Sequence, residues 1–161
     1  MTDDAVVFAL LPLRDLKSHE RVVAKKVRAL ASEIRRRGVF EDPIWVARGS
    51  GVILNGHHRA AALRRLGAER VPAWVIDYDA DLVRLGRWDD GPPIAKDEVV
   101  RRGLAGDLYP PRTTRHSLVV PLPSRPTPIE ELGVPPGKSP DRTQRRRSSS
   151  GRSRGRSAAD G

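Results

Sequence analysis

The chain has 161 residues, with 30 Lys and Arg against 20 Asp and Glu, and its formal net charge is +10. Because it contains no cysteine, disulfides, cysteine-ligated zinc and thiol nucleophiles are excluded. No apolar run approaches the ~20 residues of a membrane span, and the start, Met1-Thr2-Asp3-Asp4, is acidic with no signal-like stretch behind it. We therefore expect a cytoplasmic protein without a membrane partner.

Alternating short apolar runs and one longer helical pattern predict a small domain that mixes strands with single helices. Val23, Val27, Leu30 and Ile34 recur at helical spacing, and Gly38 follows as a C-cap. Such an alternation favours a compact α+β (mixed α/β) domain with a small mixed sheet. In chain order we predict a strand over 6–13, a helix over 22–37, a hairpin of strands 43–46 and 52–54, a helix over 56–66, strands over 71–78 and 82–88, a helix over 96–104, a strand over 117–122 and a turn over 129–132.

The positive charge is concentrated at the C-terminal end. Residues 136–161 hold eight Lys or Arg against two Asp, a net charge of +6, in a stretch rich in Pro, Gly and Ser. Such a composition buries too little apolar surface to fold. We therefore expect one folded domain over 5–134 and a disordered tail over 135–161, whose contact with nucleic acid would be non-specific and salt-dependent.

The most informative motif is the junction between a predicted strand and a predicted helix at Asn55-Gly56-His57-His58-Arg59. Free backbone N–H groups and the helix dipole make such a helix start an anion site, and Arg59 with two imidazoles favours phosphate. The alternative is that both histidines cap or cover the helix end and Arg59 is solvated.

Two further polar clusters contain the remaining histidines. His19-Glu20 precedes the long helix, where Glu20 is either a helix cap or a general base. The segment from Tyr109 to His116 is predicted as an extended loop fixed by two prolines. Its polar side chains suit several phosphate oxygens, although a solvated basic loop is the alternative. They are Arg112, Thr113, Thr114, Arg115 and His116.

Several common sites are absent from the sequence. There is no GxxxxGK[ST] and no GxGxxG motif, so a Walker-type P-loop and a Rossmann fingerprint are excluded. His57 and His58 are adjacent, so on a helix they point about 100° apart and would not chelate one ion together. No other spacing of His, Asp and Glu predicts a metal site.

The order of these motifs resembles the ParB/sulfiredoxin superfamily. Sulfiredoxin carries a catalytic cysteine where this chain has His57, so that activity is excluded. ParB partition proteins have Gly-Glu-Arg-Arg for CTP and a helix-turn-helix domain behind it, neither of which this chain shows.

A third branch, the free L-serine kinases, is similar over about residues 6–132. The family has His-Glu after the first strand, Asp-Gly-His-His-Arg, Tyr-Asp…Trp, a Lys-acid-x-Val helix and Pro-Pro-Lys-Thr-Thr-Arg-His, in this order. The matching segments here are 19–20, 55–59, 78–88, 96–99 and 110–116, with Arg112 in place of Lys and Asn55 in place of Asp.

The resemblance implies transfer of a phosphoryl group from ADP or ATP to free L-serine, with Mg²⁺ carried by the nucleotide. Glu20 would be the base, and Asn55 and His57 would complete the catalytic set. Because the family's Asp is thought to assist catalysis or hold magnesium, Asn55 bears directly on activity. The implied phosphate-binding residues are Gly56, His57, His58, Arg59, Thr113, Thr114, Arg115 and His116, and the implied substrate-binding residues are His19, Trp88 and Arg112.

Two alternatives remain at this stage. A ParB-like regulator would bind a nucleotide or DNA without phosphoryl transfer, and Asn55 and the basic tail favour it. A nuclease is disfavoured because no carboxylate cluster for two metals is present. For Trp88, burial in the core is the alternative to a place in the substrate pocket.

Overall fold

The computed structural model describes residues 5–136. The expected tail lies almost entirely in 137–161, outside the described residues. Among the described helices, none has both the length and the apolar character needed to cross a membrane.

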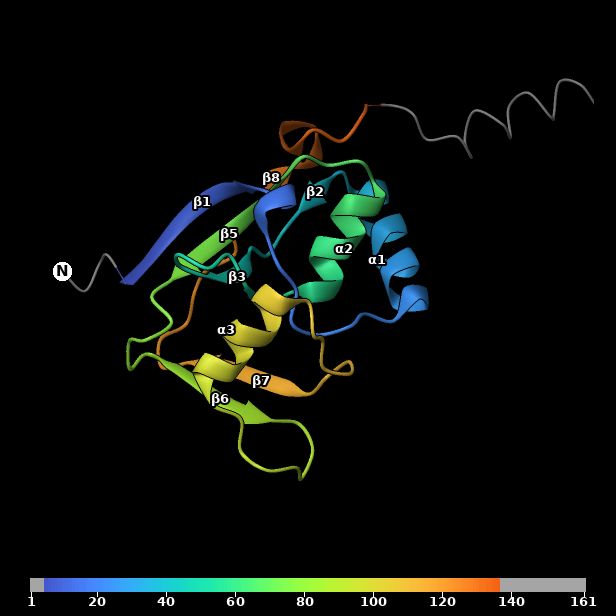
Figure 1. The fold of residues 1–161 in the computed structure, drawn as a ribbon. Helices are drawn as coiled ribbons and strands as arrows, with labels where there is room; N and C mark the ends of the chain where they lie inside the picture. The colour runs from blue at the N-terminus through green and yellow to red at the C-terminus, as the bar shows by residue number, and fades with distance from the viewer. Residues whose placement is uncertain (1–4, 137–161) are drawn as a thin grey trace, which may run out of the picture.

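A four-stranded mixed sheet forms the centre of the domain (Figure 1), in the order β1-β5-β3-β4. β5 (Arg70–Ile76) pairs antiparallel with β1 (Val6–Pro12) and parallel with β3 (Ile44–Ala47), which forms a hairpin with β4 (Ile53–Asn55). This sheet confirms the predicted α+β class.

Side chains on the sheet alternate between two apolar clusters because successive strand residues point to opposite faces. Ile44 and Val46 contribute to a cluster with α1 (Ala24–Arg37) and α2 (His57–Arg65), which pack against each other. Ala47 and Leu54 contribute to a cluster on the other face. α3 (Lys96–Ala105) and β6 (Val83–Arg87) cover that second face.

On the same face of the sheet as α3, β6 pairs antiparallel with β7 (Thr114–Leu118), and this pair lies beside α3 in Figure 1. The prediction of a strand over 117–122 is wrong in position, since β7 begins three residues earlier. The reason is its antiparallel register, which sets Thr114 opposite Arg87 and turns Thr114 and His116 inward. Val119 and Val120, whose apolar side chains suggested the strand, are 51% and 48% exposed.

Three short elements were not predicted from the sequence. β2 (Val39–Phe40) pairs with β8 (Thr127–Pro128), and a 3-10 turn over Leu13–Asp15 follows β1. A last 3-10 turn, Ile129–Leu132, falls where a turn was expected. β8 and this turn bring Ile129 and Leu132 into the α1–α2 cluster, so the segment after β7 closes the core.

Candidate functional site

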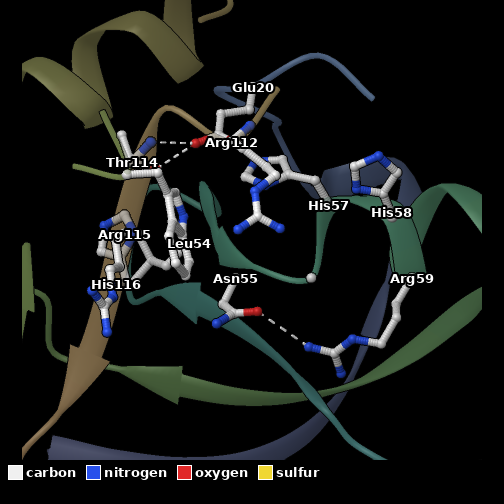
Figure 2. Close-up of a pocket in the computed structure, with 12 residues that line it drawn as sticks. Glu20, Leu54, Asn55, His57, His58, Arg59, Arg112, Thr114, Arg115 and His116 are labelled. Carbon is white, nitrogen blue, oxygen red and sulfur yellow. Dashed lines mark hydrogen bonds between the residues drawn. The ribbon is translucent and has the colours of Figure 1, made fainter. Parts of the chain in front are cut away.

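A cavity of about 290 Å³ opens where β4, the start of α2, β7 and the segment before α1 meet. It brings together motifs that lie up to about a hundred residues apart in the sequence, and Figure 2 shows their side chains around it. The cavity is lined by Glu20, Leu54, Asn55, Gly56, His57, His58, Arg59, Trp88, Arg112, Thr114, Arg115 and His116.

Gly56 makes the junction between β4 and α2 sterically possible. It is the N-cap of α2, with φ 102°, a left-handed conformation that favours glycine. A Cβ at this position would lie 2.5 Å from Ile44 Cγ2. The chain can therefore turn directly from the sheet into the helix, and the first turn of α2 faces the cavity.

The side chains of the first turn of α2 are already engaged by the protein. His57 Nε2 accepts a hydrogen bond from the His19 N–H (3.2 Å), and His58 Nε2 accepts one from the Val23 N–H (3.0 Å). Each of these nitrogens accepts, so both imidazoles are neutral in this arrangement. Burial lowers the pKa of His57 well below its usual range and also lowers that of His58.

Arg59 braces the loop ahead of β3. Its guanidinium donates to the carbonyl oxygens of Asp42 and Pro43, the latter at 3.0 Å, and to Asn55 Oδ1 at 3.3 Å. Figure 2 shows the last of these bonds along the cavity wall. Arg59 lines the cavity, but its donors are partly committed to the backbone.

Glu20 is a buried carboxylate held at the edge of the cavity, 9% exposed. Oε1 accepts from the Arg112 N–H (3.1 Å), while Oε2 accepts from the Thr114 N–H (2.7 Å) and the Thr114 hydroxyl (2.6 Å). The alternative that it caps α1 is wrong, because the N-cap is Val23 and no side chain caps it.

The loop that binds Glu20 has an unusual backbone. Arg112 has φ 58°, and among the described residues it is the one non-glycine with a positive φ. A left-handed conformation costs an ordinary residue roughly 1–2 kcal/mol. Here it directs the Arg112 N–H toward Glu20, so local strain is coupled to the placement of the carboxylate.

Two further imidazoles, His19 behind the cavity wall and His116 in its lining, are bonded within the protein. His19 is fully buried and bonds to the Ile53 carbonyl oxygen and the Thr114 hydroxyl, both at 2.8 Å. His116 Nε2 is 2.6 Å from the Tyr78 hydroxyl. Burial, followed by the positive charges that His19 and Lys96 can carry, lowers the pKa of His116 to about 3, whereas the nearby Leu54 backbone acts in the opposite direction.

Trp88 stands at the mouth of the cavity. It is 50% exposed, so the alternative of a buried core tryptophan is wrong. The guanidinium carbons of Arg112 and Arg115 lie 4.4 and 4.8 Å from its ring centroid. Within the described part of the chain neither guanidinium donates a hydrogen bond, so both present their donors to a ligand.

The structure brings most of the predicted site residues to one cavity, with two exceptions. His19 and Thr113 do not line it. His19 lies behind the wall, and the Thr113 hydroxyl donates to the Pro110 carbonyl oxygen at 2.7 Å within the loop. The sequence did not predict the hydrogen bond between Tyr78 and His116, although Tyr78 begins the Tyr-Asp…Trp segment that resembles the free L-serine kinases.

The cavity does not suit a metal ion held by protein ligands alone. No group of three or more His, Asp or Glu among residues 5–136 could hold one. Glu20 is the single carboxylate in the lining, and Asn55 Oδ1 accepts from Arg59. An ion that enters with a nucleotide would therefore depend on phosphate oxygens and water for its ligands.

Sequence comparisons identify L-serine kinases among the relatives of this chain. No protein-family model matches it. It is 34% identical over 87 residues to the ADP-dependent L-serine kinase SerK of Thermococcus kodakarensis, across 52% of this chain and 36% of that protein. An ATP-dependent L-serine kinase of Desulfurococcus mucosus is 35% identical over 104 residues, 59% of this chain and 40% of that protein. A ParB-like protein of Sulfolobus acidocaldarius is 38% identical over 76 residues, 47% of this chain and 38% of that protein.

Solved structures show the same fold. Free serine kinase in complex with AMP superposes with a TM-score of 0.69 at 21% identity, covering 80% of this chain and 93% of that one. C-terminally truncated SbnI from Staphylococcus aureus gives a TM-score of 0.70 at 13% identity, covering 86% and 93%. The chain spans 40% or less of the length of the curated kinases it matches. It is thus similar in sequence to L-serine kinases over about half its length, and it has the fold of free serine kinase and of SbnI.

Proposed function

We propose that this chain is a small-molecule kinase that transfers a phosphoryl group from ADP or ATP to the hydroxyl of free L-serine, giving O-phospho-L-serine. The observation that carries the proposal is the convergence of a buried, oriented carboxylate, a helix N-terminus and two uncommitted guanidinium groups on one cavity. The sequence similarity to L-serine kinases supports the acceptor and the donor.

In this proposal the two sides of the cavity hold the reactants. The N–H groups at the start of α2 and the guanidinium groups of Arg112 and Arg115 bind the anionic phosphates and the carboxylate of the amino acid. His57 and His58 orient polar ligand atoms as neutral imidazoles. Trp88 forms an aromatic wall. A magnesium ion carried by the nucleotide would be held by phosphate oxygens and water and would neutralise phosphate charge.

Glu20 is the proposed base. Its carboxylate takes the proton of the acceptor hydroxyl as that oxygen bonds to phosphorus, and the bond from phosphorus to the bridging oxygen of the nucleotide breaks. The three hydrogen bonds to Glu20 hold the carboxylate at the edge of the cavity. Asn55, in place of the family's Asp, cannot act as a base, so the base role falls on Glu20.

The test is incubation of the chain with L-serine, Mg²⁺ and either ADP or ATP, followed by mass spectrometry for phosphoserine. Glu20→Gln should lower kcat by about 10² or more, the usual contribution of a general base. ADP binding, measured by calorimetry, should remain. A variant that keeps near-normal turnover would remove Glu20 from the base role.

A ParB-like regulator is the second candidate, favoured by the ParB-like relative and by Asn55. It would bind the nucleotide in the same cavity, transfer no phosphoryl group and act in the cytoplasm on DNA. A gel shift with the full chain and with a chain ending at residue 136 separates specific DNA binding from non-specific attraction by the basic tail.

A further inference from the structure

A line of hydrogen bonds runs from the cavity into the core behind Glu20. The Thr114 hydroxyl oxygen lies 2.6 Å from Glu20 Oε2 and 2.8 Å from His19 Nε2. On the far side of the imidazole, His19 Nδ1 is 2.8 Å from the Ile53 carbonyl oxygen. The three side chains are 9%, 7% and 0% exposed in the order Glu20, Thr114, His19, so solvent hardly reaches the line.

This geometry fixes the number of protons in the line. A carbonyl oxygen only accepts, so His19 Nδ1 must carry a proton. The two remaining contacts, at 2.6 and 2.8 Å, each need a proton, and the Thr114 hydroxyl supplies only one. The other proton comes from one end of the line, as an N–H at His19 Nε2 or as an O–H on Glu20.

We propose that Glu20, Thr114 and His19 form a proton relay that shares one proton in addition to that of the Thr114 hydroxyl. His19 is the positioning residue that holds this proton when Glu20 acts as a base. The catalytic part of this inference rests on the proposed function. The existence of the relay rests on the hydrogen-bond geometry alone.

The proton transfer leaves the total charge of the relay unchanged. In the form with a neutral Glu20, its O–H donates to the Thr114 oxygen and the Thr114 hydroxyl donates to His19 Nε2. The O–H bond of Glu20 breaks as its proton passes to the Thr114 oxygen, and the original Thr114 proton forms a new N–H bond at His19 Nε2. The Thr114 hydroxyl then donates to Glu20 Oε2, the direction described for the site. Glu20 thereby becomes a carboxylate and His19 an imidazolium. Glu20 can then take the proton of the acceptor hydroxyl and release it to solvent after the product leaves.

Polar and titratable groups surround both ends of the relay. At one end, the Arg112 and Thr114 N–H groups donate to the Glu20 carboxyl oxygens. Burial lowers the pKa of His19, whereas Glu20, with Oε2 3.9 Å from Nε2, raises it. The other groups that face this imidazole are His57, His116 and Tyr109, with ring centroids at 4.6, 5.7 and 6.2 Å, and His57 is neutral because it accepts from the His19 N–H.

The direct test is an NMR measurement on the full chain without substrate. At pH 7 the ¹⁵N shift of His19 Nε2 and the ¹³C shift of the Glu20 carboxyl report the two ends. The relay requires a proton at one end, or shared between them. An ionised Glu20 beside a neutral His19, or a proton on both, would overturn it.

Thr114→Val breaks the line while it keeps the shape and the backbone N–H. The relay then predicts that the two residues no longer share a proton, so the ¹³C shift of Glu20 and the ¹⁵N shift of His19 cease to change together with pH. Thr114→Ser, which retains the hydroxyl, should restore the coupled behaviour. Identical protonation states in the wild type and Thr114→Val would also contradict the relay.

Kinetics test the catalytic part. Thr114→Val should lower kcat for phosphoserine formation about tenfold or more and shift the acidic limb of its pH profile, with the KM values for L-serine and nucleotide little changed, and Thr114→Ser should recover most of the rate. Raised KM values with an unmoved pH profile would indicate a structural role and refute the catalytic part. If the wild-type chain makes no phosphoserine, the proposed function fails, and the NMR measurement still decides the relay.

Discussion

The two sides of the cavity differ in how much of their polar chemistry the protein itself uses. On the α2 side, His57, His58 and Arg59 all bond to backbone groups. On the β7 side, the guanidinium groups of Arg112 and Arg115 stack on Trp88 and donate no hydrogen bond within residues 5–136. Motifs that look equally basic in the sequence therefore have different roles in the structure.

This difference predicts that the two sides of the cavity contribute to different properties, the α2 side to the stability of the fold and the β7 side to the affinity for a ligand. A side chain that satisfies a backbone donor or acceptor contributes to the fold, and its loss leaves that group without a partner. A guanidinium that only stacks on a half-exposed ring contributes little to the fold and keeps its donors for a ligand. Substitutions on the α2 side should mainly lower the free energy of unfolding, and substitutions at Arg112 or Arg115 should mainly weaken ligand binding.

At neutral pH, the substitution with the largest expected effect on the free energy of unfolding is at Gly56. Gly56→Ala combines a positive φ with a Cβ 2.5 Å from Ile44 Cγ2, so the free energy of unfolding should fall by about 3 kcal/mol. Urea denaturation measures it. Gly49→Ala is the matched control, with φ 88° and no atom within 4 Å of its Cβ. Equal losses in the two variants would show that the close packing against Ile44 does not matter.

His116 is the member of the β7 side that contributes to stability. Its pKa is about 3 in the folded chain, against an ordinary 6.5, so between these values the unfolded chain binds more protons. The free energy of unfolding should be fully retained above pH 6.5 and should fall by about 1.4 kcal/mol per unit as the pH drops toward 3. Denaturation curves at several pH values test this, and His116→Gln should have a shallower slope. An unchanged slope would assign the acid sensitivity to other groups.

Substitutions at Arg115 and Arg59 test whether the β7 side of the cavity serves ligand binding and the α2 side serves stability. Arg115→Met keeps an apolar stem on Trp88 and should weaken ADP binding by about 10- to 100-fold, the value of a charged hydrogen bond, with an almost unchanged unfolding curve. Arg59→Met should lower the free energy of unfolding by about 1 kcal/mol and have the smaller effect on ADP affinity. Calorimetry measures the ADP affinity of both variants, and urea denaturation measures their free energy of unfolding. A larger loss of affinity in Arg59→Met, or a larger loss of stability in Arg115→Met, would refute the assignment of the two sides.

The smallest effect is expected at Asn55. Asn55→Asp introduces a carboxylate beside Arg59, which already contacts this side chain at 3.3 Å. If the site is a weakened kinase, phosphoserine formation should rise severalfold, with the nucleotide affinity in the same range. Absence of activity in both forms would favour the regulator.

The sequence predicted the elements with strong local patterns. The long helix ends at Gly38 as expected from its C-cap, and α2 begins directly after Gly56. The strand at β7 was misplaced because its inward residues, Thr114 and His116, are polar and pack toward the site. Apolar periodicity cannot detect such a strand.

The convergence of the motifs was predicted, but the hydrogen bonds within them were not. Nothing in the local sequence shows that Thr114 bonds to both Glu20 and His19, which lie more than ninety residues away. The exposure of Trp88 depends on the β6–β7 pairing and on two arginines that follow it by more than twenty residues. These features depend on tertiary contacts.

The most direct test of the central claim is a crystal structure of the chain with ADP and Mg²⁺. We expect the phosphates to lie between the N-terminus of α2 and the guanidinium groups of Arg112 and Arg115, with Glu20 facing the terminal phosphoryl group. A nucleotide bound elsewhere, or phosphates without contact to either side of this cavity, would contradict it.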